Sequence, residues 1–195
     1  MDKNPNKVRD IATLDKILTK DFFDEKNRCI RLKHPRRAVL DITTKCNQRC
    51  PFCYRWTAIS STEKHFRKEK ILKIAEMLYD SGVTTLTLSG GEPLTHPSFN
   101  EIIAKIGSIG FRLGIVTNGC LMTEKIINAL VKYDVDVEVT VLGPDGYDDL
   151  LRGFPGGHKK VLENLEKLNQ FGIFPGIVTN LTRFCYIESN YLVST

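Results

Sequence analysis

No apolar run in this 195-residue chain approaches the length of a membrane-spanning helix. The first ten residues, MDKNPNKVRD, lack the hydrophobic core of a secretion signal. The net charge is +5, but the basic residues are dispersed along the chain, which argues against a nucleic-acid-binding surface. These absences predict a cytoplasmic protein with neither a membrane nor a nucleic-acid partner.

The chain also lacks internal repeats and low-complexity segments. Its composition, 42% apolar and 26% charged, is that of a globular protein, and its length suits one compact domain. We expect a charged N-terminal lead-in over residues 1–35 and a core domain over residues 36–195.

The six cysteines do not form the pattern of a disulfide framework. Three of them stand alone in the sequence: Cys29, Cys120 and Cys185. The other three crowd into eight residues: Cys46, Cys50 and Cys53. Since a chain without a secretion signal is expected in a reducing compartment, clustered thiols indicate a metal site.

Short β-branched segments alternate with amphipathic helical patterns. The five predicted strands are 38–44, 83–89, 111–117, 135–141 and 174–180. The clearest helical patterns are 68–80 and 157–171, and Ser98 with Glu101 matches a capping box at the start of another helix. This alternation predicts parallel strands joined by right-handed crossovers. A closed eight-stranded barrel needs about 250 residues, so we predict an α/β fold with an open, partial TIM-type barrel.

Unusual sequences follow the predicted strands. The cysteine segment follows the first strand, SGGEPL the second, TNG the third and LGPDG the fourth. Because the carboxyl ends of parallel strands carry the chemistry in such folds, we expect these four segments to meet on one rim.

Thiolates are good ligands for zinc and for iron–sulfur clusters. Structural zinc takes four protein ligands, and this segment supplies three. A four-iron cluster held by three cysteines leaves one iron open to an exogenous ligand, which suits catalysis. From the residues alone, a zinc knuckle and an electron-transfer ferredoxin loop stay open beside a catalytic cluster.

The segment CNQRCPFCY at 46–54 resembles the CxxxCxxC signature of the radical SAM superfamily, and GGEP at 90–93 is similar to its second motif. The resemblance covers roughly residues 36–185. It implies a [4Fe–4S] cluster on Cys46, Cys50 and Cys53 whose open iron chelates S-adenosylmethionine (SAM). It implies an enzyme that cleaves SAM reductively and abstracts a hydrogen atom from a peptide or cofactor precursor. A low-potential electron donor, flavodoxin or ferredoxin, is implied as well.

The resemblance also implies SAM contacts on the other segments. Gly90, Gly91 and Glu92 would contact the methionine amino group, and Tyr54 would lie near the adenine. Thr117 and Asn118, in a segment that also reads as a plain turn, would reach the ribose or the methionine part.

Residues 140–153 are similar to a stretch that often reads SLDGP…HDxxRG. Thr140 keeps a hydroxyl, whereas Leu142 replaces the acid, which puts a contact made by that acid in doubt. Arg152 would hold the methionine carboxylate. The alternative for Arg152 is a surface ion pair with Asp148 or Asp149.

The chain stops soon after the fifth strand, whereas members of the family continue through a sixth. An open strand edge exposes unpaired backbone groups, so we expect a dimer or a partner chain there. Two other functions stay open. One is an iron–sulfur electron-transfer or scaffold protein without SAM chemistry, and the other is a zinc-binding or degenerate module.

Overall fold

The computed structural model describes residues 35–53, 64–144 and 146–180. The chain separates into two units, Met1–Pro35 and Arg36–Thr195, and the second holds every helix and strand in the described residues. The predicted adenine neighbour, Tyr54, lies outside the described residues. None of the helices in the described part is long and apolar enough to cross a membrane.

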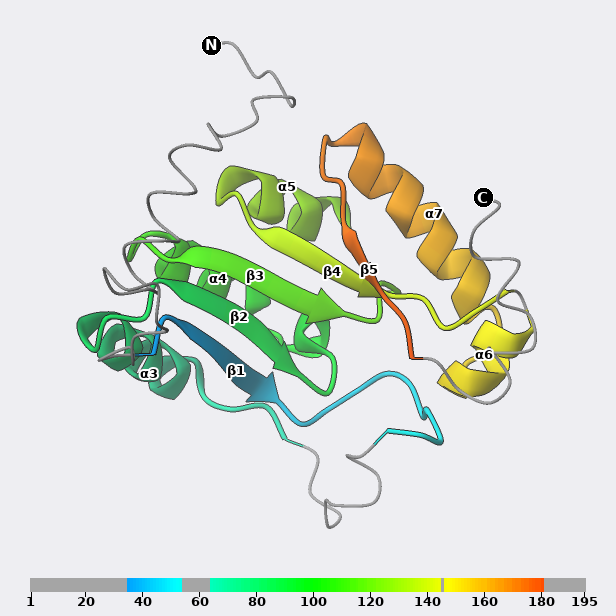
Figure 1. The fold of residues 1–195 in the computed structure, drawn as a ribbon, viewed down its shortest axis with the longest axis horizontal. Coiled ribbons are helices and arrows are strands. Elements are labelled where there is room, and N and C mark those ends of the chain that lie inside the picture. The colour runs from blue at the N-terminus through cyan, green and yellow to red at the C-terminus, as the bar shows by residue number, and fades with distance from the viewer. Residues whose placement is uncertain (1–34, 54–63, 145, 181–195) are drawn as a thin grey trace, which may run out of the picture. The chain divides into compact units, whose positions relative to one another are not determined.

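Five parallel strands form one sheet in chain order (Figure 1). The strands are β1 (Arg37–Thr43), β2 (Thr85–Gly90), β3 (Arg112–Thr117), β4 (Asp136–Thr140) and β5 (Gly176–Val178). The ends of each lie within two residues of a predicted strand, although β5 keeps only the middle of the expected 174–180. The predicted open parallel α/β fold is confirmed.

Helices connect the strands. They are α3 (Lys68–Asp80), the 3₁₀ helix η1 (Pro93–Thr95), α4 (Phe99–Gly107), α5 (Glu124–Lys132), α6 (Tyr147–Arg152) and α7 (Gly157–Gln170). The predicted capping box of α4 is wrong. Ser98 is the N-cap residue but makes no side-chain cap hydrogen bond, and Glu101 pairs with Lys68 of α3.

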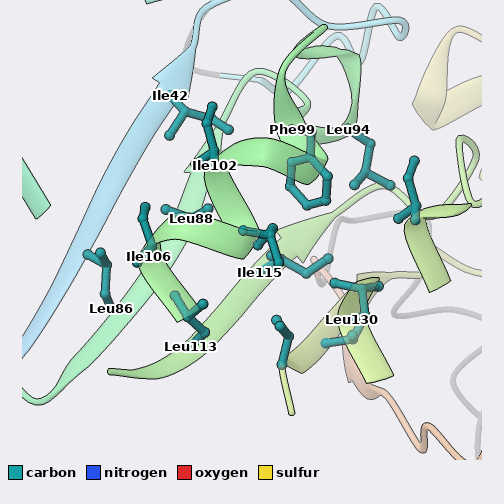
Figure 2. Close-up of a cluster of buried hydrophobic side chains, with 14 of the residues drawn as sticks. Ile42, Leu86, Leu88, Leu94, Phe99, Ile102, Ile106, Leu113, Ile115 and Leu130 are labelled. Carbon is teal, nitrogen blue, oxygen red and sulfur yellow. The ribbon is translucent and has the colours of Figure 1, made fainter. Parts of the chain in front are cut away.

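The core lies on one face of the sheet. Side chains alternate along a strand, so Leu86 and Leu88 of β2 share that face and are completely buried (Figure 2). The same cluster takes apolar residues from four helices: Ile71, Ile103, Ile127 and Leu168. Strands in chain order with right-handed crossovers place their helices on the same face. All five strands therefore present their carboxyl ends to one rim.

Candidate functional site

The cysteine loop follows β1 and bends back on itself. The Arg49 guanidinium donates to the carbonyl oxygens of Cys46 and Gln48, at 3.0 and 3.1 Å, and the Cys53 amide donates to the Cys50 carbonyl at 3.0 Å. Cys46, Cys50 and Cys53 are half-buried and form no disulfide. The assignment of the three thiols to one cluster stays a prediction.

The environment of these thiols suits a positively charged metal group. Burial, together with the smaller effect of the negative charges of Cys46 and Cys53, raises the pKa of Cys50 to about 11. Because burial and neighbouring negative charge disfavour a thiolate at Cys50, a bound cationic iron centre would stabilise its ionised form. In the described part of the chain, no three His, Cys, Asp or Glu side chains converge as for a single metal ion. Three free thiols on one loop are nevertheless the donor set that an iron–sulfur cluster takes from a protein.

The glycines that end β2 pack against the chain leading into the cysteine loop. The Gly91 amide donates to the Thr43 carbonyl at 2.9 Å, and the Glu92 amide donates to the Lys45 carbonyl at 2.8 Å. A Cβ on Gly91 would stand 2.1 Å from the Lys45 oxygen, and one on Gly90, where φ is 135°, would stand 2.3 Å from the Thr43 oxygen. These glycines therefore let β2 and the cysteine loop approach each other backbone to backbone.

Replacing Gly91 should consequently destabilise the fold. We expect Gly91→Ala to lower the free energy of unfolding by at least about 2 kcal/mol, because a backbone oxygen cannot move aside as a side chain does. Gly176→Ala is the matched control, since its Cβ would meet its nearest neighbour at 3.6 Å. Urea denaturation of both apo variants measures the difference, and equal stability of the two would contradict the close approach.

Glu92, in the segment SGGEPL, forms hydrogen bonds with the segment TNG. Its carboxylate is 1% exposed and accepts hydrogen bonds from the Leu94 amide at 3.0 Å, the Thr117 hydroxyl at 2.8 Å and the Asn118 amide at 2.7 Å. Burial raises the pKa of Glu92 to about 7, although these bonds and the charge of Arg152 act in the opposite direction. Glu92 is thus held in place from the exit of β3.

Asn118 continues this connection to the cysteine loop. Its side-chain amide donates to the Asn47 oxygen at 2.8 Å, and its own oxygen accepts from the Cys120 amide at 3.0 Å. The exits of β1, β2 and β3 therefore meet, as predicted. The contacts of Gly90, Gly91, Glu92, Thr117 and Asn118 with SAM stay predictions.

Arg152 lies inside the protein and not at its surface. It has no exposed area, and its ion pair with Asp148 is equally buried, so the alternative of a surface ion pair is wrong. Its guanidinium also donates to the carbonyl oxygen of Thr140 at the end of β4. Leu142, which replaces the expected acid, is buried beside Leu151.

Gln48 was missed by the sequence prediction. It lies between two motif cysteines, is 2% exposed, and donates from its amide to the Cys120 sulfur at 3.2 Å. A glutamine in a polar loop carries no sign of burial in its sequence context. Its partners follow only from the fold, since Arg152 is 104 residues away.

Comparisons with known proteins find relatives of this chain. AlbA, the antilisterial bacteriocin subtilosin biosynthesis protein of Bacillus subtilis, is 28% identical over 144 residues, which are 72% of this chain and 32% of AlbA. A probable GTP 3′,8-cyclase of Methanococcus maripaludis is 31% identical over 153 residues, 76% of this chain and 50% of that protein. The chain thus spans between a third and a half of the length of these relatives.

The crystal structure of Streptococcus suis SuiB bound to S-adenosylmethionine superposes with a TM-score of 0.72 at 20% identity. The match covers 83% of this chain and 38% of SuiB, and it supports the predicted barrel type of fold. The family model described as the radical SAM superfamily matches residues 40–186, which include the cysteine loop and the ends of β2, β3 and β4. The chain therefore belongs to the radical SAM superfamily.

Proposed function

We propose that this chain forms the cluster-binding core of an enzyme that cleaves SAM reductively and abstracts a hydrogen atom from its substrate. Members of the superfamily use a [4Fe–4S] cluster and SAM. The observation that carries the proposal is the hydrogen-bonded connection between the cysteine loop and Glu92, through Asn47 and Asn118. An electron carrier has no need of a buried carboxylate fixed beside its cluster loop.

In this proposal, one set of residues binds the cluster and another binds SAM. Cys46, Cys50 and Cys53 would hold three irons of the cluster and leave the fourth open. A bound and reduced cluster would supply the one electron needed to break the sulfur–C5′ bond of SAM, which would give methionine and a 5′-deoxyadenosyl radical. Glu92, when ionised, would accept hydrogen bonds from the methionine ammonium group. The Thr117 hydroxyl and the Asn118 amide would keep its carboxylate oriented.

The partners are also proposals. The electron would come from flavodoxin or ferredoxin in the cytoplasm. The substrate would be a peptide or a small cofactor precursor, because the relatives include a bacteriocin biosynthesis protein and a GTP 3′,8-cyclase. At the β5 edge, Phe174 and Ile177 are 74% and 54% exposed, which favours a dimer or a partner chain there; sedimentation of the purified protein measures this.

Anaerobic reconstitution tests the function. The full chain, loaded with iron and sulfide and reduced with dithionite, should convert SAM to 5′-deoxyadenosine without a substrate, and liquid chromatography measures the product. Omitting dithionite is the control. If the protein binds a full cluster but yields no 5′-deoxyadenosine, the alternative of an electron-transfer or scaffold protein holds instead.

A further inference from the structure

Arg152 connects four segments of the rim from inside the protein. Its Nε donates to the Asp148 carboxylate, its Nη1 donates to the Gln48 side chain at 3.4 Å and to the Asn118 carbonyl at 3.0 Å, and its Nη2 donates to the Thr140 carbonyl. A buried guanidinium needs such acceptors, because an unpaired charge away from water is costly. The bond to Asp148 lies within α6, and the other three tie the end of α6 to the cysteine loop and to the ends of β3 and β4.

The main chain around Arg152 touches the cysteine loop as well. The Arg152 carbonyl accepts from the Arg49 amide at 3.0 Å and lies 3.7 Å from the Cys50 sulfur. At Gly153, where φ is 57°, a Cβ would stand 2.7 Å from the Arg49 oxygen. The loop therefore rests directly on the end of α6, at the position of a motif cysteine.

Gln48 links the Arg152 side chain to the cysteine loop. Its Oε1 faces both the Arg152 guanidinium at 3.4 Å and the Cys50 sulfur at 3.8 Å, while its Nε2 faces the Cys120 sulfur at 3.2 Å. Because Gln48 sits between Cys46 and Cys50 in the chain, fixing its buried side chain fixes the turn that presents both thiols.

The Arg152 charge also reaches the site. It partly offsets the burial that raises the pKa of Glu92. The carboxylate of Asp148 that holds this charge is itself fixed, since it accepts from the Leu142 amide at 2.6 Å.

We propose that Arg152 is a positioning residue of the cluster site, whose buried side chain, acting through Gln48, holds the cysteine loop against the ends of β3 and β4. The consequence for the bound cluster rests on the proposed function. These bonds use four of the five N–H donors of Arg152, so one Nη2 hydrogen is left for the SAM carboxylate, and a forked two-bond contact with that carboxylate would require a protein hydrogen bond to break. The positioning role needs none to break.

Two variants test this role. Arg152→Lys keeps the charge but loses the fork of donors. Gln48→Leu leaves the Arg152–Asp148 ion pair intact, so it stays informative if Arg152→Lys fails to fold. Arg112→Lys is the matched control, because Arg112 pairs with Asp136 in an exposed ion pair at the opposite end of the sheet.

In the apo protein, we expect both variants to raise the alkylation rate of Cys50 relative to Cys53, measured by mass spectrometry of the labelled peptides. In the reconstituted protein, we expect them to shorten the lifetime of the cluster under a chelator by roughly tenfold or more. We also expect the electron paramagnetic resonance spectrum of the reduced cluster to respond less to SAM than in the wild type. Arg112→Lys should match the wild type in all three measurements.

The contrary outcomes are distinct. If the wild type binds no cluster, the proposed function fails, and the ratio of Cys50 to Cys53 alkylation in the apo protein still decides the positioning role. If that ratio is unchanged in both variants, Arg152 does not hold the loop. A fall in thermal stability with equal gains in reactivity at Cys50, Cys53 and Cys120 would show only a general structural role and would likewise overturn the proposal.

Discussion

Replacing any one of the three motif cysteines by alanine should remove both the cluster and the formation of 5′-deoxyadenosine. Two remaining thiolates hold two irons, and the third iron then exchanges with solvent and chelators. We expect iron in the reconstituted variants to fall from about four atoms per chain to near background. Iron and sulfide assays, the visible absorption of the cluster and the product assay measure the loss.

The fold should survive these substitutions, which makes the loss interpretable. Cys46, Cys50 and Cys53 are half-buried and lie outside the hydrophobic core cluster. Main-chain bonds and the Arg49 guanidinium hold the loop without the sulfur atoms. The contacts that the sulfur atoms of Cys46 and Cys50 make are long, at 3.4 to 3.8 Å. We expect the free energy of unfolding of the apo variants to change by less than about 1 kcal/mol.

Cys29→Ala is the control, because Cys29 lies outside the motif and outside residues 40–186 that match the family. It should keep the iron and the product of the wild type. If Cys50→Ala kept a full cluster and made 5′-deoxyadenosine, the three-cysteine assignment would be wrong. A cluster held without product formation in the wild type would instead support the electron-transfer alternative.

Much of the fold was predictable because its signals are local. Helix α3 matches its predicted range 68–80, since its apolar residues recur on one face. Strand–helix alternation with the unusual segments after the strands was enough to predict which segments share the rim. The length of β5 was overestimated because the sequence shows only which residues favour a strand. How far a strand extends depends on how many of its residues pair with the neighbouring strand. β5 pairs with β4 over only three residues, Gly176, Ile177 and Val178.

The connections within the site were not predictable, because each joins residues far apart in the chain. Arg152 and Gln48 are 104 positions apart, and Gln48 and Cys120 are 72 apart. From the sequence, Arg152 was expected either to bind the methionine carboxylate or to form a surface ion pair. Neither expectation includes a buried guanidinium that forms hydrogen bonds with α6, the cysteine loop and the ends of β3 and β4. Likewise, the sequence did not show that Gly90 and Gly91 approach the chain's own backbone at Thr43 and Lys45.

Glu92 should make the stability of the apo protein fall as the pH rises from about 4.5 to about 7. The pKa of Glu92 is about 7 in the folded state, against 4.5 for an unperturbed glutamate, because its carboxyl group is buried. Between these values the unfolded chain releases a proton that the folded chain retains, so deprotonation favours unfolding. A rise from 4.5 to about 7 corresponds to about 3 kcal/mol, lost across this window and constant above it.

Comparison with Glu92→Gln isolates this effect. The variant loses the acceptor that faces the Asn118 amide, which destabilises it by an amount independent of pH. Other titrating groups contribute equally to both proteins, so they cancel when the free energies of unfolding are subtracted. Relative to the variant, the wild type should therefore lose up to about 3 kcal/mol between pH 5 and pH 8, measured by urea denaturation without metal. A difference that does not change with pH would mean that Glu92 is ionised in the folded apo protein throughout.

The raised pKa of Glu92 should also make the affinity for SAM depend on pH. A carboxylate that is half protonated near pH 7 attracts the methionine ammonium group better at pH 8 than at pH 6. Bound SAM should in turn pull the pKa of Glu92 down towards its ordinary value. In the reconstituted protein, the affinity of the wild type for SAM, measured by equilibrium dialysis, should rise between these pH values, whereas that of Glu92→Gln should be weaker and rise less. Because the ammonium group titrates in both proteins, only the difference between them reports on Glu92, and equal pH dependence would remove Glu92 from the binding site.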